Sequence, residues 1–273
     1  ELRKMLCLGQ NFRFGFYDVP PRERLRAIRA AGFDAVMFWW GNEFDATDGD
    51  KHERMRAALG LGLKVNTLHF PSTHADYLWR EELCEGYADL IIEALEDCAR
   101  YGVENLVLHT TRALITPPYN AAGLNALGRA VAAAERLGVN IAAENTRFPA
   151  YNGYIYKNIP SGRLTLCYDT GHEHCYTKEK NILDLFGDRL TTTHIHDNDG
   201  SSDQHHLMGE GNIDFAPVFG RLARMGVKYY NLESYCNETS RYYGKLTMQE
   251  FLSLSYRTLT EKLDFSRALS HRG

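Results

Sequence analysis

Leu164-Thr165-Leu166-Cys167-Tyr168-Asp169 is an apolar run that ends in a carboxylate, and its pattern decides the fold. Because side chains alternate between the two faces of a strand, the bulky Leu164, Leu166 and Tyr168 share one face, which suits packing against helices. The smaller residues between them share the other face with Asp169, and this face suits the interior of a narrow barrel. The run therefore predicts a parallel strand with Asp169 at its carboxyl end.

The same pattern recurs along the chain, where apolar segments end in a histidine or a carboxylate. The residues that close these segments are His69, His109, Glu144, Asp169, His196 and Glu233. In a (β/α)8 barrel the carboxyl ends of all strands converge on one mouth, so residues far apart in sequence become neighbours. His194 shares a strand face with His196 and is expected one layer deeper in the barrel.

Strand and helix patterns alternate throughout the chain. Strands are predicted over 5–9, 35–39, 64–69, 105–109, 140–144, 164–169, 192–196 and 229–233. Helices are predicted over 21–31, 52–61, 83–101, 121–137, 182–186, 215–225 and 248–263. With no linker rich in Pro, Gly or Ser, this order predicts an α/β protein with a single TIM-barrel domain over 1–273. An open doubly wound sheet is the alternative, but the first turn lacks the glycine-rich phosphate-binding fingerprint of that fold.

Length and composition limit the class of protein. The 273 residues are 44% hydrophobic, which fits one large domain with a full core. No stretch approaches a membrane span and no signal-like segment opens the chain, and a net charge of -4 does not favour a nucleic-acid partner. The 6 cysteines are scattered without Cys-x-x-Cys spacing, so we expect a reduced, cytoplasmic protein with Cys7 and Cys167 as core-strand thiols.

The carboxylates at the strand ends predict a metal site. Burying Glu144, Asp169 and Glu233 together without a cation would leave like charges close to one another, and a divalent cation removes that conflict. His172, three residues after Asp169, adds a local signal of the same kind. Asp203 and His205 lie in the segment 197–214, where they either supply further ligands or belong to a solvated loop.

These motifs together resemble the xylose-isomerase-like TIM-barrel superfamily, which includes endonuclease IV, the ketohexose 3-epimerases and inositol-pathway isomerases. The resemblance covers nearly the whole barrel. It rests on Leu68-His69, Leu108-His109, Ala143-Glu144-Asn145-Thr146, Cys167-Tyr168-Asp169-Thr170-Gly171-His172, His194-Ile195-His196-Asp197-Asn198-Asp199, Asp203-Gln204-His205, Gly209-Glu210-Gly211-Asn212-Ile213-Asp214-Phe215 and Leu232-Glu233-Ser234.

The resemblance implies two ligand sets. The epimerases hold one Mn(II)-type ion, and the matching residues are Glu144, Asp169, His196 and Glu233, of which Glu144 and Glu233 would be catalytic and exchange a proton with the substrate carbon from opposite faces. The nuclease branch holds three zinc ions, and the additional matching positions are His69, His109, His172, Asp203 and His205. The expected cofactor is a divalent metal (Mn, Zn, Co or Mg), with Mn or Zn favoured, because mixed histidine and carboxylate ligands serve both.

The strand-to-helix loops bear on the substrate. They are acidic over 43–50 and 197–214, whereas their arginines are isolated, which argues against DNA. Aromatic residues such as Trp39 suit a small polar ring, so a neutral sugar or polyol is favoured. The residues expected to bind it are His69, His109, His172, Arg147 and Trp39. For Arg147 an ion pair at the protein surface is an equally weighted alternative.

The sequence therefore predicts a metal-dependent enzyme, a sugar or sugar phosphate isomerase or epimerase that moves a proton next to a carbonyl group. Two alternatives remain open: a zinc phosphodiesterase that acts at abasic DNA sites, and a non-catalytic metal-dependent sugar-binding barrel. A small-molecule sugar or polyol is the expected partner, without nucleic acid or membrane, and a homo-oligomer is compatible with the sequence.

Overall fold

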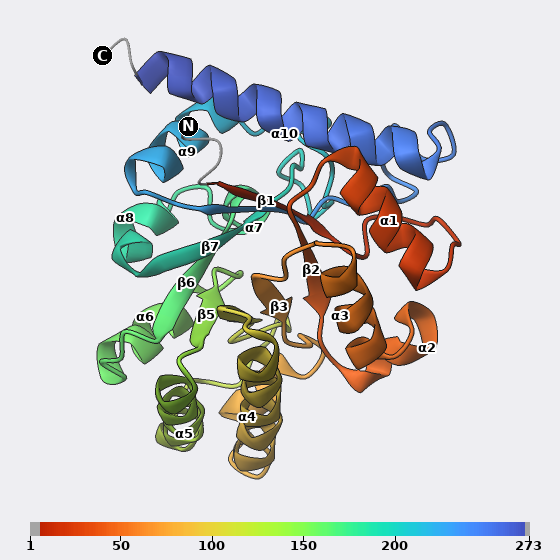
Figure 1. The fold of residues 1–273 in the computed structure, drawn as a ribbon. Coiled ribbons are helices and arrows are strands. Elements are labelled where there is room, and N and C mark those ends of the chain that lie inside the picture. Colours follow the sequence, from red (N-terminus) through yellow and green to blue (C-terminus); the bar gives the residue numbers. More distant parts are fainter. Residues whose placement is uncertain (1–5, 271–273) are drawn as a thin grey trace.

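A closed parallel barrel forms the centre of the molecule. The computed structural model describes residues 6–270. The strands are β1 (Cys7–Asn11), β2 (Ala35–Trp39), β3 (Thr67–His69), β4 (Asn105–Leu108), β5 (Asn140–Glu144), β6 (Leu164–Asp169), β7 (Leu190–Ile195) and β8 (Tyr229–Leu232). Each strand pairs in parallel with its neighbours in sequence, and β8 pairs with β1 to close the ring (Figure 1). The predicted single (β/α)8 TIM barrel is confirmed.

Helices surround the barrel. They are α1 (Pro21–Ala31), α2 (Asp45–Asp48), α3 (Lys51–Gly60), α4 (Cys84–Tyr101), α5 (Ala121–Leu137), α6 (Pro149–Asn158), α7 (Thr170–Tyr176), α8 (Ile182–Phe186), α9 (Phe215–Arg224) and α10 (Met248–Ser270), with the 3-10 turns η2 (Asn42–Phe44), η3 (Ala75–Trp79) and η4 (Gly187–Arg189). In Figure 1, α4 and α5 lie side by side at one side of the barrel and α10 runs along the opposite side, where it packs on α1 and α9.

Most predicted bounds agree with the structure. The elements α1, β2, α5, β5, β6 and α8 have the predicted ends. Strand β1 lies at Cys7–Asn11 instead of 5–9, and Met5 is outside the described residues. Helices α6 and α7 were not predicted; both follow strands that carry the candidate ligands.

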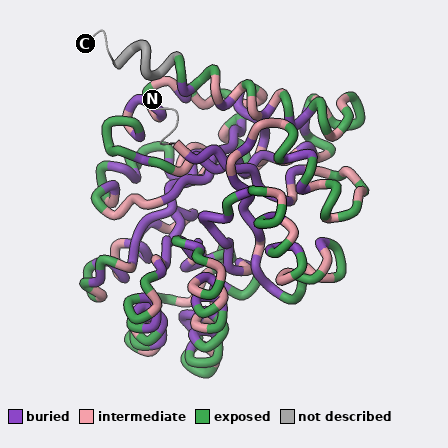
Figure 2. The backbone as a smooth tube through the Cα atoms, viewed as in Figure 1, coloured by how far each residue is buried: buried purple, intermediate pink, exposed green. Residues whose placement is uncertain are grey.

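The core lies in two compartments, as the strand pattern predicted. Leu164, Leu166 and Tyr168 belong to the large cluster between the barrel and its helices. Cys167 instead packs inside the barrel with Val107 and Ala142. In Figure 2 the strands are buried and the exposed residues lie on the outer sides of the helices. A truncation such as Leu166→Ala would cost about 2–5 kcal/mol, because a cavity would remain in a close-packed core.

The barrel interior becomes polar toward the carboxyl ends of the strands. The hydroxyl groups of Thr67 and Thr192 form a hydrogen bond of 3.2 Å, and the Asn231 amide donates to the Thr192 hydroxyl at 3.1 Å. These buried polar groups form the layer beneath the histidines and carboxylates that follow.

All 6 cysteines are free thiols, and Cys7 and Cys167 are buried in core strands as predicted. None of the helices in the part of the chain that the structure describes combines the length and apolarity needed to cross a membrane.

Candidate metal centre

The histidines and carboxylates predicted at the strand ends are buried at one end of the barrel. Glu144 and Asp169 are the last residues of β5 and β6, and Glu233 directly follows β8. These three side chains are almost completely shielded from solvent, with at most 1% exposure. Buried carboxylates need cationic or hydrogen-bonding partners, and the surrounding imidazoles supply them.

A first compact group consists of Glu144, Asp169, His194 and Glu233, whose potential ligand atoms all lie within 4.8 Å of one another. Strand register explains why His194 belongs to it, because Asp169 and His194 are directly paired across β6 and β7. His194 Nδ1 lies 3.2 Å from Glu144 Oε1, 3.2 Å from Glu233 Oε2 and 4.0 Å from Asp169 Oδ2. One imidazole nitrogen thus faces all three carboxylates.

Imidazoles also control the charge of the two glutamates. Glu144 lies 3.2 Å from His69 and 3.0 Å from His109. Burial raises the pKa of Glu144, but the charges of His194 and His109 outweigh burial and hold this pKa well below its usual range. For Glu233 burial again raises the pKa, yet the charge of the facing His194 imidazole lowers it to about 2. Both glutamates are therefore ionised at neutral pH.

A second compact group consists of His172, His196, Asp203 and His205. The Asp203 carboxylate lies 3.2 Å from His172 Nε2 and 3.2 Å from His205 Nε2, and 3.7 Å from His196 Nε2. Burial lowers the pKa of His205, but the neighbouring Asp203 carboxylate raises it to about 9. His172 links the two groups, because its Nδ1 lies 3.2 Å from Glu144 Oε1.

Local backbone features position these side chains. Asp169 caps α7 by accepting a hydrogen bond from the His172 amide at 2.6 Å, which fixes His172 one turn beyond the strand end. The residue just before His172 must be a glycine, because a Cβ at Gly171 would lie 1.9 Å from His196 Cε1. His205 has a φ of 50°, an unusual backbone conformation for a residue with a side chain, and such strain is concentrated at functional sites.

Asp197 holds the loop that carries Asp203 and His205. Its carboxylate accepts hydrogen bonds from the backbone amides of Asn198 at 2.9 Å, Gly209 at 2.8 Å, Gly211 at 3.1 Å and Ile213 at 3.1 Å. The Asp197 backbone also pairs with that of His206. Four amides on one buried carboxylate fix the path of the whole loop.

The donor set fits a divalent cation. Several buried polar atoms in the two groups lack a hydrogen-bond partner within the described chain: Glu144 Oε1, His194 Nδ1, His194 Nε2, His196 Nδ1 and Asp203 Oδ1. Unpaired buried polar atoms are costly, and a cation among them would use their lone pairs. Mixed imidazole and carboxylate ligands suit Mn, Zn, Co and related ions.

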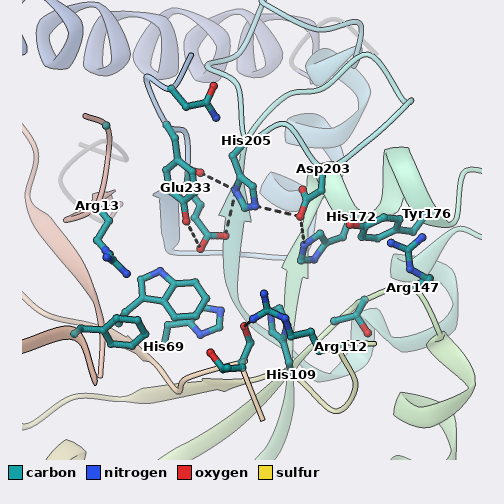
Figure 3. A pocket seen from close by; sticks show the side chains of 18 of the residues that line it. Arg13, His69, His109, Arg112, Arg147, His172, Tyr176, Asp203, His205 and Glu233 are labelled. Atoms are coloured by element: carbon teal, nitrogen blue, oxygen red, sulfur yellow. Dashed lines mark hydrogen bonds and ion pairs between the residues drawn. The ribbon is translucent and has the colours of Figure 1, made fainter. Parts of the chain in front are cut away.

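A cavity of about 710 Å³ opens above these groups (Figure 3). Glu233, Asp203, His172 and His205 line it, whereas Glu144 lies beneath the lining residues His69 and His109. The Trp39 ring, also in the wall, stacks on His69 with the ring centres 3.8 Å apart. The volume lies in the range of small-molecule sites.

The candidate residues named from the sequence all lie at or beside this cavity, and the candidate ligands form several overlapping groups, one of which consists of His69, His109 and Glu144. His196 contacts Asp169 at 3.1 Å but lies in the group of Asp203 and His205, and His194 occupies the place among the three carboxylates. His194 was expected in the deeper layer and was not included among the candidate ligands. The alternation of side chains along the strand would have allowed either His194 or His196 as a ligand, because both face the barrel interior.

Sequence comparison and structure comparison identify related proteins. A sequence profile described as "Xylose isomerase-like TIM barrel" matches residues 25–249. An uncharacterized protein of Methanocaldococcus jannaschii is 29% identical over 160 residues, which span 55% of this chain and 62% of that protein. The fructoselysine 3-epimerase of Shigella flexneri is 29% identical over 101 residues, or 35% of this chain and 36% of that protein.

Among solved structures, one described as L-ribulose 3-epimerase superposes with a TM-score of 0.75 at 18% identity, covering 97% of both chains. At this identity the likeness shows a common fold. The chain spans less than two thirds of the length of these two curated relatives.

Proposed function

Because the chain belongs to the xylose isomerase-like TIM barrel family, we propose that it is a divalent-metal-dependent isomerase or epimerase acting on a small sugar or polyol. The observation that carries this proposal is the burial of Glu144, Asp169 and Glu233 with facing histidines beneath a cavity of about 710 Å³. The epimerase names of the relative from Shigella flexneri and of the superposed structure support it.

We also propose that residues 1–273 form one domain. The free cysteines support a reducing compartment, such as the cytoplasm.

The residues proposed to hold the cation are Glu144, Asp169, His196 and Glu233. His196 is proposed as the histidine ligand because its Nε2 lies 3.1 Å from Asp169, between the two groups, and the family resemblance assigns this role to the matching histidine. We assign His194 to the support of the Glu144 and Glu233 carboxylates from below, at 3.2 Å from each. A bound divalent cation would polarise the substrate carbonyl and stabilise negative charge on its oxygen.

Glu144 and Glu233 are the proposed acid-base pair. Their low pKa values keep both carboxylates ionised at neutral pH, which is the form that accepts a proton. One carboxylate takes the proton from the carbon beside the carbonyl, and a carboxyl group then returns it. Return to the opposite face of the same carbon is epimerisation, and return to the adjacent carbon is aldose–ketose isomerisation; both leave the atoms and charges balanced.

Solvent-deuterium exchange tests this assignment. In D2O, the metal-loaded protein should incorporate deuterium beside the carbonyl of a ketose substrate, observed by proton NMR. Glu144→Gln and Glu233→Gln should each lower the exchange rate by at least about 100-fold, because an amide cannot accept the proton. Glu93→Gln on the exposed side of α4 is the matched control and should exchange like the unaltered chain. Undiminished exchange in both active-site variants would refute the two-carboxylate mechanism.

The second group, formed by His172, His196, Asp203 and His205, favours one alternative, a zinc phosphodiesterase with several ions. Elemental analysis separates the two functions: about one ion per chain fits the isomerase, whereas about three zinc ions together with nicking of abasic DNA fit the nuclease. A protein that binds a sugar without any exchange would be the non-catalytic barrel.

A further inference from the structure

Two arginines face the cavity without an acidic partner. Arg112 and Arg147 both line the cavity, and neither forms an ion pair with a carboxylate of the described residues. Arg13 also lines it but is paired with Asp48 at 3.4 Å. In Figure 3, Arg112 and Arg147 lie on the side that carries His109 and His172, across from Arg13.

Arg147 is held by an aromatic ring. Its Cζ lies 4.0 Å above the centre of the Tyr176 ring, at the end of α7. The Arg147 N–H groups remain available as donors, since no hydrogen bond to another described residue engages them. The stacking restricts the side chain, so little further ordering is needed when these donors bind a ligand.

Arg112 is fixed through its backbone and one nitrogen. The two oxygens of Asp76 accept hydrogen bonds from the amides of Arg112 at 3.2 Å and Ala113 at 2.8 Å. Arg112 Nη1 donates to the buried Ser72 hydroxyl at 3.2 Å. One end of the guanidinium is therefore anchored, and its remaining donors are available to the cavity.

The acidic loop residues do not neutralise these arginines. Asp50 and Asp214 accept hydrogen bonds at the N-termini of α3 and α9. Asp197 accepts four backbone amides, and Glu210 accepts from Leu207, Ser240 and Arg241. These four acidic residues therefore build the loops, whereas Asp203 of the same acidic segment lines the cavity and pairs with His172 and His205.

We propose that the substrate carries a terminal anionic group, a phosphate ester or a carboxylate, that binds to Arg112 and Arg147 while its carbonyl end faces Glu233. The sugar part of this proposal rests on the proposed function. Two guanidinium groups match the charge of a phosphate monoester, and such charge-assisted pairs are strong where water is partly excluded. A phosphodiester backbone is less suited, because duplex DNA needs basic residues spread over a wide surface.

The test compares neutral ketoses with their anionic counterparts on the manganese-loaded protein. The probes are D-fructose, D-fructose 6-phosphate, D-fructuronate, D-ribulose and D-ribulose 5-phosphate. Deuterium exchange gives kcat/KM, and calorimetry gives Kd. We expect the anionic member of at least one pair to be preferred by about 30-fold or more. A preference for phosphate esters alone identifies a phosphate site, and an equal preference for D-fructuronate identifies a general anion site.

Variants assign that preference to the two arginines. Arg112→Gln and Arg147→Gln should each reduce it by about tenfold. Arg147→Lys should restore part of it, because the charge remains without the planar fork. Arg136→Gln, on the exposed side of α5, is the matched control and should keep the full preference.

The outcomes separate this inference from the proposed function. Exchange without any preference for anionic substrates overturns the inference and leaves the proposed function intact. Preferential binding of anionic probes without exchange in any of them supports the inference and refutes the proposed function. Binding of no probe overturns the inference, as does nicking of an abasic duplex that disappears in Arg112→Gln and Arg147→Gln.

Discussion

Gly171 and His196 show how closely the site is packed at the level of single residues. A side chain at position 171 would overlap the His196 ring, whose Cε1 would lie 1.9 Å from the new Cβ. Gly171→Ala should therefore displace His196 and lower manganese affinity by at least about tenfold, with a circular dichroism spectrum like that of the unaltered chain. Titration followed by elemental analysis measures the loss.

Gly128→Ala is the control for this substitution. Gly128 lies inside α5 with no atom near the position of a new Cβ, so alanine there should leave metal affinity unchanged and stabilise the helix by about 0.5–1 kcal/mol. Equal affinities in Gly171→Ala and the unaltered chain would show that His196 does not take part in metal binding.

For single residues, the sequence identified most of the side chains of the candidate site but did not predict how they group in space. The positions of Glu144, Asp169 and Glu233 follow from apolar runs that end in polar residues, and the structure gathers them. The grouping of His194 with these carboxylates depends on the pairing of β6 with β7, and sequence periodicity does not reveal this register. The unpaired state of Arg147 also depends on three-dimensional neighbours.

The loop over 197–213 is organised around one carboxylate, and this is a property of a whole element. Asp197→Asn would replace an acceptor of four amides by a neutral group that accepts more weakly. We expect amide hydrogen exchange at Gly209, Gly211 and Ile213 to become at least about tenfold faster, whereas the amides of β6 should keep their protection. Unchanged loop protection would mean that Asp197 does not hold the loop.

Helices with strong helix-forming residues between clear cap residues were predicted well, and helices without that combination were not. Helix α5 has an Ala-rich segment between Asn120 and Gly138, and its bounds were correct. Helix α6 is rich in aromatic residues and contains Gly153, which weakens helix propensity. Helix α7 begins directly after Asp169, whose carboxylate both caps the helix and faces the site. The sequence pattern indicated only a metal ligand at Asp169, so the helix start was not predicted.

For the whole molecule, the ionised groups of the site should make the stability of the metal-free protein depend on pH. The pKa of His205 is about 9 in the fold, above the ordinary value of 6.5, so its protonation favours folding. This contribution is complete below about pH 6.5 and is lost as the pH rises through about 9. With EDTA present, we expect the free energy of unfolding in urea to fall by on the order of 2 kcal/mol across that window.

His205→Gln provides the comparison, since it lacks the titrating group and should show a smaller decrease between the same pH values. Manganese should also flatten the profile, because a bound cation replaces protons as the partner of the carboxylates. A metal-free protein whose stability rises between pH 6.5 and 9 would contradict the charge assignment of Asp203 and His205.

The barrel brings the proposed ligands together from β5 to β8, so the decisive question is whether they hold one ion. Crystals soaked in Mn2+ and measured at the manganese absorption edge would answer it through anomalous scattering. We expect an anomalous peak within about 2.0–2.6 Å of oxygens from Glu144, Asp169 and Glu233 and of a nitrogen from His196. Manganese bound only elsewhere, or three carboxylates that share no common ion, would contradict the metal centre and the proton transfer built on it.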